Sequence, residues 1–341
     1  MLPTLVKVPA AKGYKRRKRD TSYLHMPELI HVWSRCHACG AAPIIGLRFS
    51  CQTCPSGPDN DLCDACHRTF QQGGVQHPPP EAREAPPGAH LFRAFEGVAR
   101  EQLAPWLAVP WSSAPAPAIA DRFVVRPEFR SGPESFFGSY GFVVAAQDGG
   151  PPLMLTALHV LDELAKFKGI DCTSLNAAYT GAELPPCVTG VKLYDPFAPN
   201  WVLAELGAAG AMLCLPEARI CPDEPYSQRD VAAFRVGSST PVHPARLAVA
   251  APTVGEPIWL AVNLGRSVRE RTIAAVVVEV TERTLVFRFV EGTAMPTYTS
   301  GAPLLDRTGE VVGLNIGGGM LDGHRIGHAS HAASMRRHLN W

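Results

Sequence analysis

Short apolar runs, separated by Gly, Pro and Asp, recur along the chain from about residue 136 onwards. Examples are residues 140–146, 153–160, 230–236 and 272–280. Runs of this length and spacing predict the short strands of a mostly β barrel or sandwich. Their order fits two barrels that divide near residue 240. Helical periodicity is confined to the residues just after the second run and to a short segment near the C-terminal end.

The first 135 residues follow a different pattern. Residues 1–22 contain a run of Lys and Arg and predict a disordered basic tail, either solvated or in contact with nucleic acid or an acidic partner. Residues 23–95 hold a cluster of cysteines and little hydrophobic periodicity, as expected where metal replaces a core. Residues 96–135 predict a linker with one connecting helix at 95–107. Residues 136–341 then form the β domain.

Composition narrows the class of protein. A length of 341 residues suits two or three domains, and the formal net charge of +1 argues against a whole-chain nucleic-acid binder. The sequence contains no apolar stretch of about 18 residues, and its start lacks the order of a signal peptide, so we expect a cytoplasmic protein without membrane contact. Six of the ten cysteines lie between Cys36 and Cys66, which in a reducing compartment indicates metal ligands and not disulfides.

Three Cys-x-x-Cys pairs make up the cysteine cluster. They are Cys36 with Cys39, Cys51 with Cys54, and Cys63 with Cys66. Each pair places two sulfurs on one ion, and a structural zinc ion takes four ligands. Six cysteines therefore require two histidines to complete two sites. His77 and His90 are the candidates, because His67 directly follows Cys66 and points poorly toward the same ion.

Two segments of this region resemble the ZZ-type zinc finger, and the resemblance covers residues 31–95. They are Gly46-x-Arg48-Phe49-x-Cys51 and Asp61-Leu62-Cys63-x-x-Cys66. The resemblance implies a small cross-braced domain with two structural zinc ions. One ion would be held by Cys36, Cys39, Cys63 and Cys66, and the other by Cys51, Cys54, His77 and His90. A Pro-rich insert separates the two histidines here, whereas they lie close together in the family.

The same resemblance implies a peptide-binding role. ZZ fingers bind peptides, often a free N-terminus, through acidic side chains, and Asp59 and Asp61 lie where such acids are expected. Two carboxylates hold an ammonium group by charge-assisted hydrogen bonds. Asp61 equally fits a structural role in which its carboxylate orders the zinc loop. His37 stands where members that read a basic N-terminus carry an acid, so we expect a different kind of peptide or protein partner.

A His, an Asp and a Ser occur in this order at the ends of apolar runs. His159 ends Leu-Thr-Ala-Leu-His, Asp230 begins Asp-Val-Ala-Ala-Phe, and Ser300 lies in Thr-Ser-Gly-Ala-Pro-Leu-Leu. A serine hydroxyl becomes a nucleophile when a histidine removes its proton. The imidazole needs a carboxylate that fixes its tautomer and stabilises the imidazolium. Each residue alone also fits a strand end or a turn, but together they predict a catalytic triad.

These segments, with Gly-Ser-Tyr-Gly at 138–141 and Gly-Glu-Val-Val-Gly-Leu-Asn at 309–315, resemble trypsin-like peptidases. The resemblance covers residues 121–341 and is nearest to the high-temperature-requirement (Deg-type) branch. It implies a chymotrypsin-like fold of two six-stranded β-barrels with the triad at their junction. Val160 replaces the cysteine that secreted members carry beside the histidine, which fits a reducing compartment.

The nucleophile segment departs from the family pattern Gly-x-Ser-Gly-Gly. Tyr298 replaces the glycine whose N–H, with that of Ser300, forms the oxyanion hole in the family. A side chain resists the dihedral angles of that turn, so we expect the hole to form when a partner or substrate orders the loop. The resemblance also places Ala294 at the base of the substrate pocket and Gly317 and Gly318 on its wall. Such a pocket would admit an apolar side chain and not Arg or Lys.

These observations favour an intracellular serine endopeptidase whose zinc module recruits a protein substrate or an activating partner. The alternative is a non-catalytic ZZ adaptor with a degenerate protease fold, for which the replacement by Tyr298 is the argument. A role in nucleic-acid binding depends on the basic tail alone and has the least support.

Overall fold

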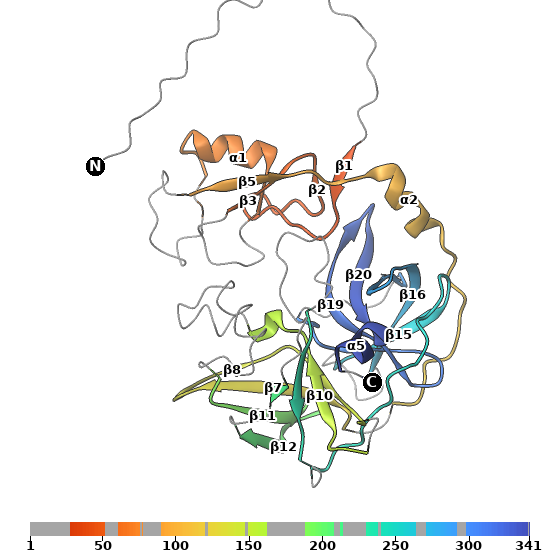
Figure 1. Cartoon of the computed structure of the whole chain (residues 1–341). Coiled ribbons are helices and arrows are strands. Elements are labelled where there is room, and N and C mark those ends of the chain that lie inside the picture. The colour runs from red at the N-terminus through yellow and green to blue at the C-terminus, as the bar shows by residue number, and fades with distance from the viewer. Residues whose placement is uncertain are drawn as a thin grey trace, which may run out of the picture.

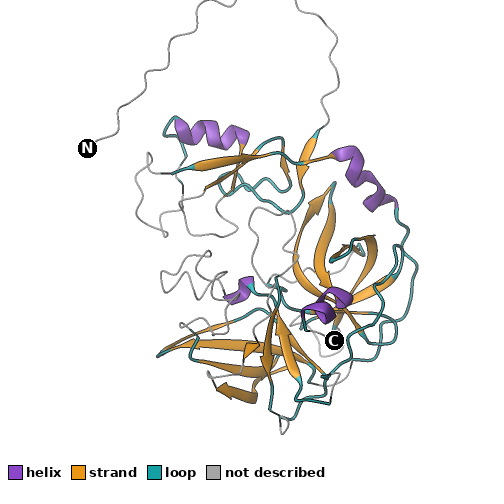
Figure 2. Ribbon diagram, in the orientation of Figure 1, coloured by secondary structure: helices purple, strands orange, loops and turns teal. Residues whose placement is uncertain are grey.

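Strands dominate the computed structural model of the chain, as the apolar runs predict (Figure 2). The structure describes residues 28–51, 61–75, 77, 90–119, 122–146, 149–161, 188–207, 212–213, 230–237, 240–263, 271–291, 298–339 and 341. The basic tail predicted at 1–22 and most of the helix predicted after His159 lie outside this part of the chain. Within it, no helix is long and apolar enough to cross a membrane.

Two small three-stranded sheets and one helix form the N-terminal module (Figure 1). The first sheet has the order β2-β1-β6, formed by Ile44–Ile45, Leu29–His31 and Val98–Ala99. The second has the order β4-β3-β5, formed by Asp61–Cys63, Arg48–Cys51 and Phe92–Phe95, and α1 (Asp64–Gln71) follows β4. The buried residues of its core cluster are Cys36, Ile44, Leu62 and Phe70. A small apolar core among the described residues is typical of domains that depend on a metal for their stability.

The connecting helix α2 spans Arg100–Ala108 and packs on the second barrel. The sequence predicted this helix at 95–107. Its first residues instead belong to β5 and β6, because they pair with β3 and β1. Leu103 and Trp106 are buried against Val276 and Val278 of β16 in a shared apolar cluster. The Trp106 indole N–H also donates to Glu279 at 2.7 Å.

The first β-sheet of the larger domain has eight strands in the described residues, with the order β12-β11-β7-β9-β10-β14-β13 and β8 paired to β7. The strands are β7 Val124–Ser131, β8 Glu134–Phe137, β9 Gly141–Val144, β10 Leu153–Thr156, β11 Gly190–Asp195, β12 Ala198–Gly207, β13 Met212–Leu213 and β14 Ala232–Arg235. Strand β7 of this sheet thus lies before residue 136, in the segment predicted as a linker. Pro127 and the charged residues of β7 gave this strand the composition of a linker.

The second sheet is a closed barrel with the order β15-β16-β17-β20-β19-β18. Its strands are β15 Pro257–Ala261, β16 Thr272–Val280, β17 Thr284–Phe289, β18 Pro303–Leu305, β19 Val311–Leu321 and β20 His324–His331. The helix α5 (Ala332–His338) follows, as the periodicity near the C-terminal end predicts. This barrel has the six strands that the family resemblance implies, whereas the first sheet has eight among the described residues, because the hairpin strand β8 and the short strand β13 extend it.

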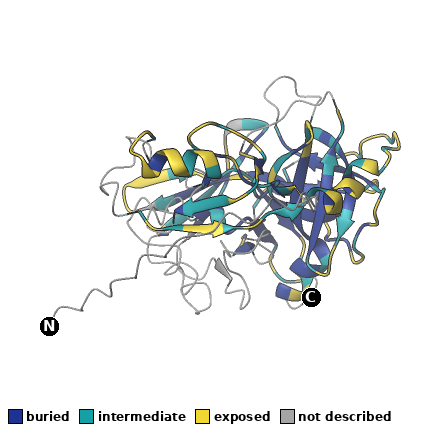
Figure 3. Ribbon diagram, turned by 90° about the horizontal axis from the view of Figure 1, so that it is seen from above, coloured by how far each residue is buried: buried dark blue, intermediate teal, exposed yellow. Residues whose placement is uncertain are grey.

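One continuous apolar core joins the two barrels, with Phe142 and Phe234 from the first and Leu260 and Phe287 from the second. Figure 3 shows buried residues concentrated in the barrel strands, whereas α1 of the N-terminal module is largely exposed. The candidate site lies at the junction of the two barrels, which this shared core joins.

Candidate active site

His159, Asp230 and Ser300 form one chain of hydrogen bonds. The His159 Nδ1 atom lies 2.5 Å from Asp230 Oδ2, and the His159 Nε2 atom lies 2.9 Å from Ser300 Oγ. The backbone N–H of His159 also donates to Asp230 Oδ1 at 2.7 Å. The Asp230 side chain is 1% exposed, so its carboxylate is shielded from water. The three residues predicted from separate apolar runs therefore meet at one point.

The first barrel positions the histidine and the aspartate. His159 follows β10 and Asp230 precedes β14, and these two strands pair antiparallel with Thr156 opposite Ala232. Antiparallel pairing brings the end of one strand beside the start of the other. The two side chains thus emerge at the same edge of the sheet, directed toward the second barrel.

The second barrel positions the nucleophile. The backbone N–H of Gly301 donates to the Asn315 carbonyl at 2.7 Å, and the Asn315 amide donates to the Thr299 carbonyl at 3.0 Å. The carbonyl of Ser300 accepts from the Tyr140 N–H at 3.0 Å, which ties the turn to the first barrel. These bonds fix the residues on both sides of Ser300, so its hydroxyl has a defined direction.

The hydroxyl of Ser300 has a second acceptor besides the imidazole. Its Oγ atom lies 3.0 Å from the backbone carbonyl of Ile316 in β19. Because Nδ1 of His159 faces the carboxylate, the neutral imidazole carries its proton there and offers a lone pair at Nε2. A hydroxyl has one proton, so the imidazole and the Ile316 carbonyl compete for it.

Tyr298, predicted to lie at the oxyanion hole, has a φ of +60° and a side chain that is 81% exposed. This is the left-handed conformation that glycine adopts more easily. Within the described residues, neither the Tyr298 N–H nor the Ser300 N–H donates a hydrogen bond to the protein. Two neighbouring donors of this kind are the elements of an oxyanion hole.

Of the predicted pocket residues, Gly317 and Gly318 lie on β19, and Ala294 lies outside the described residues. Gly317 pairs with His328 on the adjacent strand β20. Burial lowers the pKa of His328 to about 4, and the charge of Asp230 opposes this shift, so the ring is neutral near pH 7. The residues next to His328 in the chain carry no signal that selects it, and the run of glycines at 317–319 is the one sequence feature that could have pointed to a close approach at β19.

Four cysteines of the N-terminal module form one group. The Sγ atoms of Cys36, Cys39, Cys63 and Cys66 lie within 4.8 Å of one another. Burial alone would raise the pKa of the Cys36 thiol, but backbone N–H groups of Cys39 and Cys63 donate to it and lower the pKa to about 7. Four thiols at this separation, with one stabilised as a thiolate, fit a structural zinc ion.

Cys51, His77 and His90 form a second group, again with ligand atoms within 4.8 Å of one another. Cys54, the predicted fourth ligand, lies outside the described residues. Both ring nitrogens of His77 are buried without a hydrogen-bond partner among the described residues. Burial also lowers the pKa of His77 to about 4, which keeps the ring neutral. A buried neutral imidazole without a partner fits a zinc ligand, because a metal would satisfy it.

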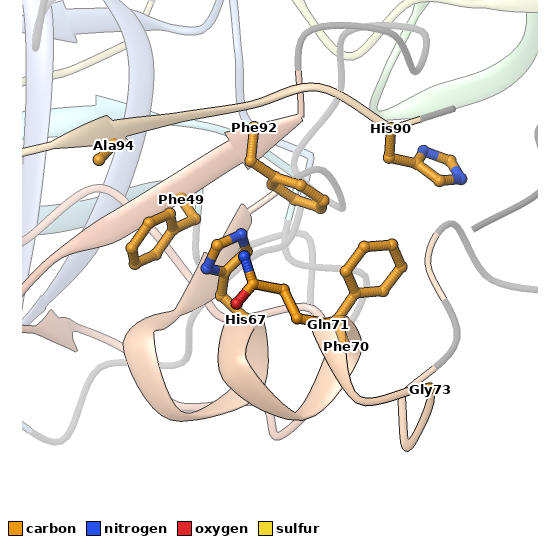
Figure 4. Close-up of a pocket in the computed structure, with 8 residues that line it drawn as sticks. All are labelled: Phe49, His67, Phe70, Gln71, Gly73, His90, Phe92 and Ala94. Atoms are coloured by element: carbon orange, nitrogen blue, oxygen red, sulfur yellow. The ribbon is translucent and has the colours of Figure 1, made fainter. Parts of the chain in front are cut away.

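His67 belongs to neither group, as the sequence predicted. Its ring stacks on Phe49 with a centroid separation of 3.8 Å. The two rings line an open groove of about 590 Å³ beside α1 and β5 (Figure 4). Figure 4 shows the rings of Phe70, Phe92 and His90 along the same groove.

Of the predicted peptide-binding acids, Asp61 is described and Asp59 is not. The Asp61 carboxylate lies 3.3 Å from the Arg48 guanidinium, and its side chain is 13% exposed. Burial raises the pKa of the Asp61 carboxyl, and Arg48 opposes the shift. These contacts fit the structural alternative, in which the Asp61 carboxylate links β4 to Arg48 of β3.

A buried carboxylate, an imidazole and a hydroxyl between two β-barrels define the class of serine hydrolases with a triad. The family comparison makes this specific. The model of the trypsin-like peptidase domain matches residues 138–314, more than half of the 341 residues, and the chain belongs to this family. The model of the ZZ-type zinc finger matches residues 30–78. The chymotrypsin-like fold and the N-terminal zinc finger predicted from the sequence are therefore confirmed.

No curated protein matches the chain. Similar solved structures are serine proteases at low identity. The Rv3671c protease from M. tuberculosis in its active form is 17% identical, with a TM-score of 0.40 over 68% of this chain and 92% of that chain. The serine endoprotease from Yersinia pestis is 16% identical, with a TM-score of 0.38 over 64% of this chain and 61% of that chain. Deg5 is 16% identical, with a TM-score of 0.39 over 64% of this chain and 87% of that chain.

Proposed function

We propose that this member of the trypsin-like family is a serine endopeptidase that cleaves peptide bonds in protein substrates, with Ser300 as nucleophile, His159 as general base and Asp230 as its orienting carboxylate. The hydrogen-bonded chain from Asp230 through His159 to Ser300, with distances of 2.5 and 2.9 Å, is the observation that carries the proposal.

The geometry fits the two half-reactions of acyl transfer. Ser300 Oγ attacks the carbonyl carbon of the scissile bond, and its proton moves to His159 Nε2. The resulting imidazolium is stabilised by Asp230 and then gives the proton to the leaving amine as the C–N bond breaks. A water molecule next attacks the acyl-enzyme with the same histidine as base. The carboxylic acid product leaves, and the Ser300 hydroxyl is restored.

The competition for the Ser300 proton links this chemistry to substrate binding. An extended substrate that donates a backbone N–H to the Ile316 carbonyl would occupy the second acceptor of the hydroxyl. The hydroxyl proton would then be directed to the imidazole alone, which is the arrangement required for attack. Substrate binding would in this way favour the reactive hydrogen bond.

The N–H groups of Tyr298 and Ser300 are the proposed oxyanion donors. The left-handed conformation of Tyr298 costs about 1–2 kcal/mol relative to glycine, so this half of the hole is the less stable one. Each donor of an oxyanion hole contributes about 3–4 kcal/mol to transition-state stabilisation. Ordering of this turn by substrate or partner is therefore the proposed point of control. With Ala294, Gly317 and Gly318 as pocket residues, the preferred side chain would be apolar.

The N-terminal module has the proposed role of a recruiting domain that holds two structural zinc ions. Cys36, Cys39, Cys63 and Cys66 would hold one, and Cys51, Cys54, His77 and His90 the other. Zinc in such sites cross-links the chain and takes no part in the hydrolysis. The groove in Figure 4 supports the recruitment of a peptide or protein, and Asp59 and Asp61 stay candidate contacts. The cytoplasmic location also stays a prediction.

Covalent labelling with a fluorophosphonate probe tests the proposed chemistry. The wild-type chain should be labelled and should cleave an unfolded protein substrate. Ser300→Ala should abolish labelling, and His159→Ala should lower the cleavage rate by a factor on the order of 10⁴–10⁶. Ser135→Ala, which changes an exposed serine on β8, is the matched control and should retain both activities. A folded wild-type chain that is never labelled, even with candidate partners added, would support the non-catalytic adaptor.

A further inference from the structure

The zinc-binding module and the peptidase domain meet at the strand β19. The Met320 N–H donates to the Val32 carbonyl at 3.3 Å. A Cβ atom on Gly319 would lie only 1.9 Å from the Val32 oxygen and 3.2 Å from the Trp33 Cα atom. A side chain at residue 319 is therefore incompatible with this contact, because the backbone of the module lies directly against the strand.

This contact lies close to the nucleophile. The Ile316 carbonyl accepts from Ser300 Oγ, and the next residue, Gly317, pairs with His328. The ring of Trp33 lies 4.6 Å from the His328 ring, centroid to centroid. The pKa of His328 also responds to the triad, since Asp230 raises it and His159 lowers it.

Several contacts hold the module in this position. Val32 is 4% exposed and shares an apolar cluster with Val286, Leu321 and Ile326 of the second barrel. Arg100 of α2 completes the attachment, since it lies 2.5 Å from Glu28 before β1 and 2.6 Å from Asp322 after β19. The segment that contains Trp33 is therefore part of an interface with buried apolar contacts and ion pairs. Figure 1 shows β1 next to the ends of β19 and β20.

The edge of β19 that faces Ser300 is available for a substrate strand. β18 pairs with β19 only as far as Leu314. Among the residues that the structure describes, no strand pairs with this edge from Ile316 to Gly319. An extended peptide binds such an edge through backbone hydrogen bonds, and its alternate side chains enter flanking sites. Val32 closes the edge at Met320, so the peptide must leave β19 there.

We propose that the zinc-binding module supplies one wall of the substrate cleft, in which the half-buried ring of Trp33, set on His328 beside Gly317, contacts a bulky apolar side chain of an extended peptide. Gly317 has no side chain that could contact the peptide. The ring of Trp33, from a distant part of the chain, lies on the neighbouring His328 and would make this contact instead. Cleavage specificity would then depend on both domains. This inference rests on the proposed peptidase function.

The full chain with Trp33→Ala tests the contact. Cleavage of a peptide library should lose its preference for large apolar residues at one position near the scissile bond, with kcat/KM for the preferred peptides lowered about 10- to 100-fold. The rate of Ser300 labelling by a small fluorophosphonate, which does not extend to Gly317, should fall far less. Trp33→Phe keeps an aromatic ring and should restore most of the preference. Trp201→Ala, on β12 of the first barrel and 47% exposed, is the matched control.

The outcomes separate this inference from the proposed function. An unlabelled wild-type chain contradicts the peptidase itself. A labelled Trp33→Ala chain with an unchanged library profile overturns only the proposed wall. A general rise in cleavage of all peptides also overturns it, because Trp33 would then obstruct the cleft. If Trp33→Ala fails to fold, Trp33→Leu keeps an apolar side chain but removes the aromatic ring. It should still weaken the preference for large apolar residues, and an unchanged preference would overturn the proposed wall.

Discussion

Gly301, the residue after the nucleophile, is fixed by two independent constraints. Its φ is +82°, and a Cβ atom there would lie 2.0 Å from the Tyr140 carbonyl oxygen and 2.6 Å from Thr156 Oγ1. The second constraint arises because the Tyr140 segment of the first barrel crosses directly over the nucleophile turn. Residue 301 is thus the point at which one barrel sets the position of the other barrel's nucleophile.

Gly301→Ala should therefore lower the free energy of unfolding by about 3 kcal/mol or more, through overpacking and a strained backbone. It should also slow fluorophosphonate labelling, since the turn must shift to admit the methyl group. Denaturant unfolding and labelling kinetics measure the two effects. Gly323→Ala is the control: its φ is +80°, but a Cβ atom meets nothing within 4 Å, so it should cost only about 1 kcal/mol. Equal losses for both variants would contradict the role of the close contact.

At the scale of residues, candidate site residues could be predicted where the residues next to them in the chain form a recognisable motif. The segments around His159 and Ser300 and the spacing of the cysteine pairs each depend on neighbours in the chain. Trp33 and His328 carry no such local signal, because their contact arises only when two domains pack. Asp61 lies between these cases, since its position predicted two roles and its ion pair with Arg48 favours one.

At the scale of elements, α2 is attached to the second barrel by a cation at its C-terminal end. The Arg288 guanidinium of β17 donates to the carbonyls of Trp106, Leu107 and Val109. The last turn of α2 contains no basic residue of its own. The last carbonyls of a helix lack hydrogen-bond donors within the helix and carry partial negative charge. An arginine from another strand therefore both donates hydrogen bonds to these carbonyls and interacts favourably with their charge.

Arg288→Ala should loosen α2 and, with it, the attachment of the zinc module. Loss of charge-assisted hydrogen bonds to three carbonyls should cost about 2–3 kcal/mol locally. Hydrogen–deuterium exchange in Arg100–Ala108 should accelerate, while exchange in the barrel strand β15 should change little. Arg307→Ala, which removes an exposed arginine in the turn before β19, is the control. Unchanged exchange in α2 would show that its apolar contacts alone hold it.

Strands were predictable where apolar residues were continuous. The runs at 140–146, 153–160 and 272–280 correspond to β9, β10 and β16, and their burial explains why: strands covered on both faces need apolar residues throughout. β7 and β20 were missed because they contain Pro, His and charged residues. Neighbouring strands, the N-terminal module and α2 supply their pairing and burial, and none of these partners is visible in the local sequence.

At the scale of the whole molecule, two domains with apolar cores of very different size are joined. The barrels share a large continuous core, whereas the core cluster of the N-terminal module has four buried residues in the part of the chain that the structure describes. Figure 3 shows the same contrast in the exposure of α1 and of the barrel strands. The module faces β19 beside the nucleophile, so its folding state bears directly on the shape of the proposed cleft.

Metal content gives a whole-molecule test, because two ligand groups lie in one module. The full chain should contain two zinc ions per molecule by elemental analysis. His77→Ala should retain about one, since only the group with Cys51 and His90 loses a ligand, and Cys36→Ser should lose the other. His67→Ala is the matched control and should keep both, because His67 stacks on Phe49 outside either group.

Removal of zinc by a chelator should then unfold the module alone. Because a structural metal supplies folding free energy that a small core cannot replace, exchange protection should disappear in β1 and β3 while β15 and β16 keep theirs. The proposed Trp33 wall would be lost with the module, so preference among long peptides should weaken while labelling of Ser300 continues. A chain that binds no zinc when folded, or whose barrels unfold together with the module, would contradict this division of stability.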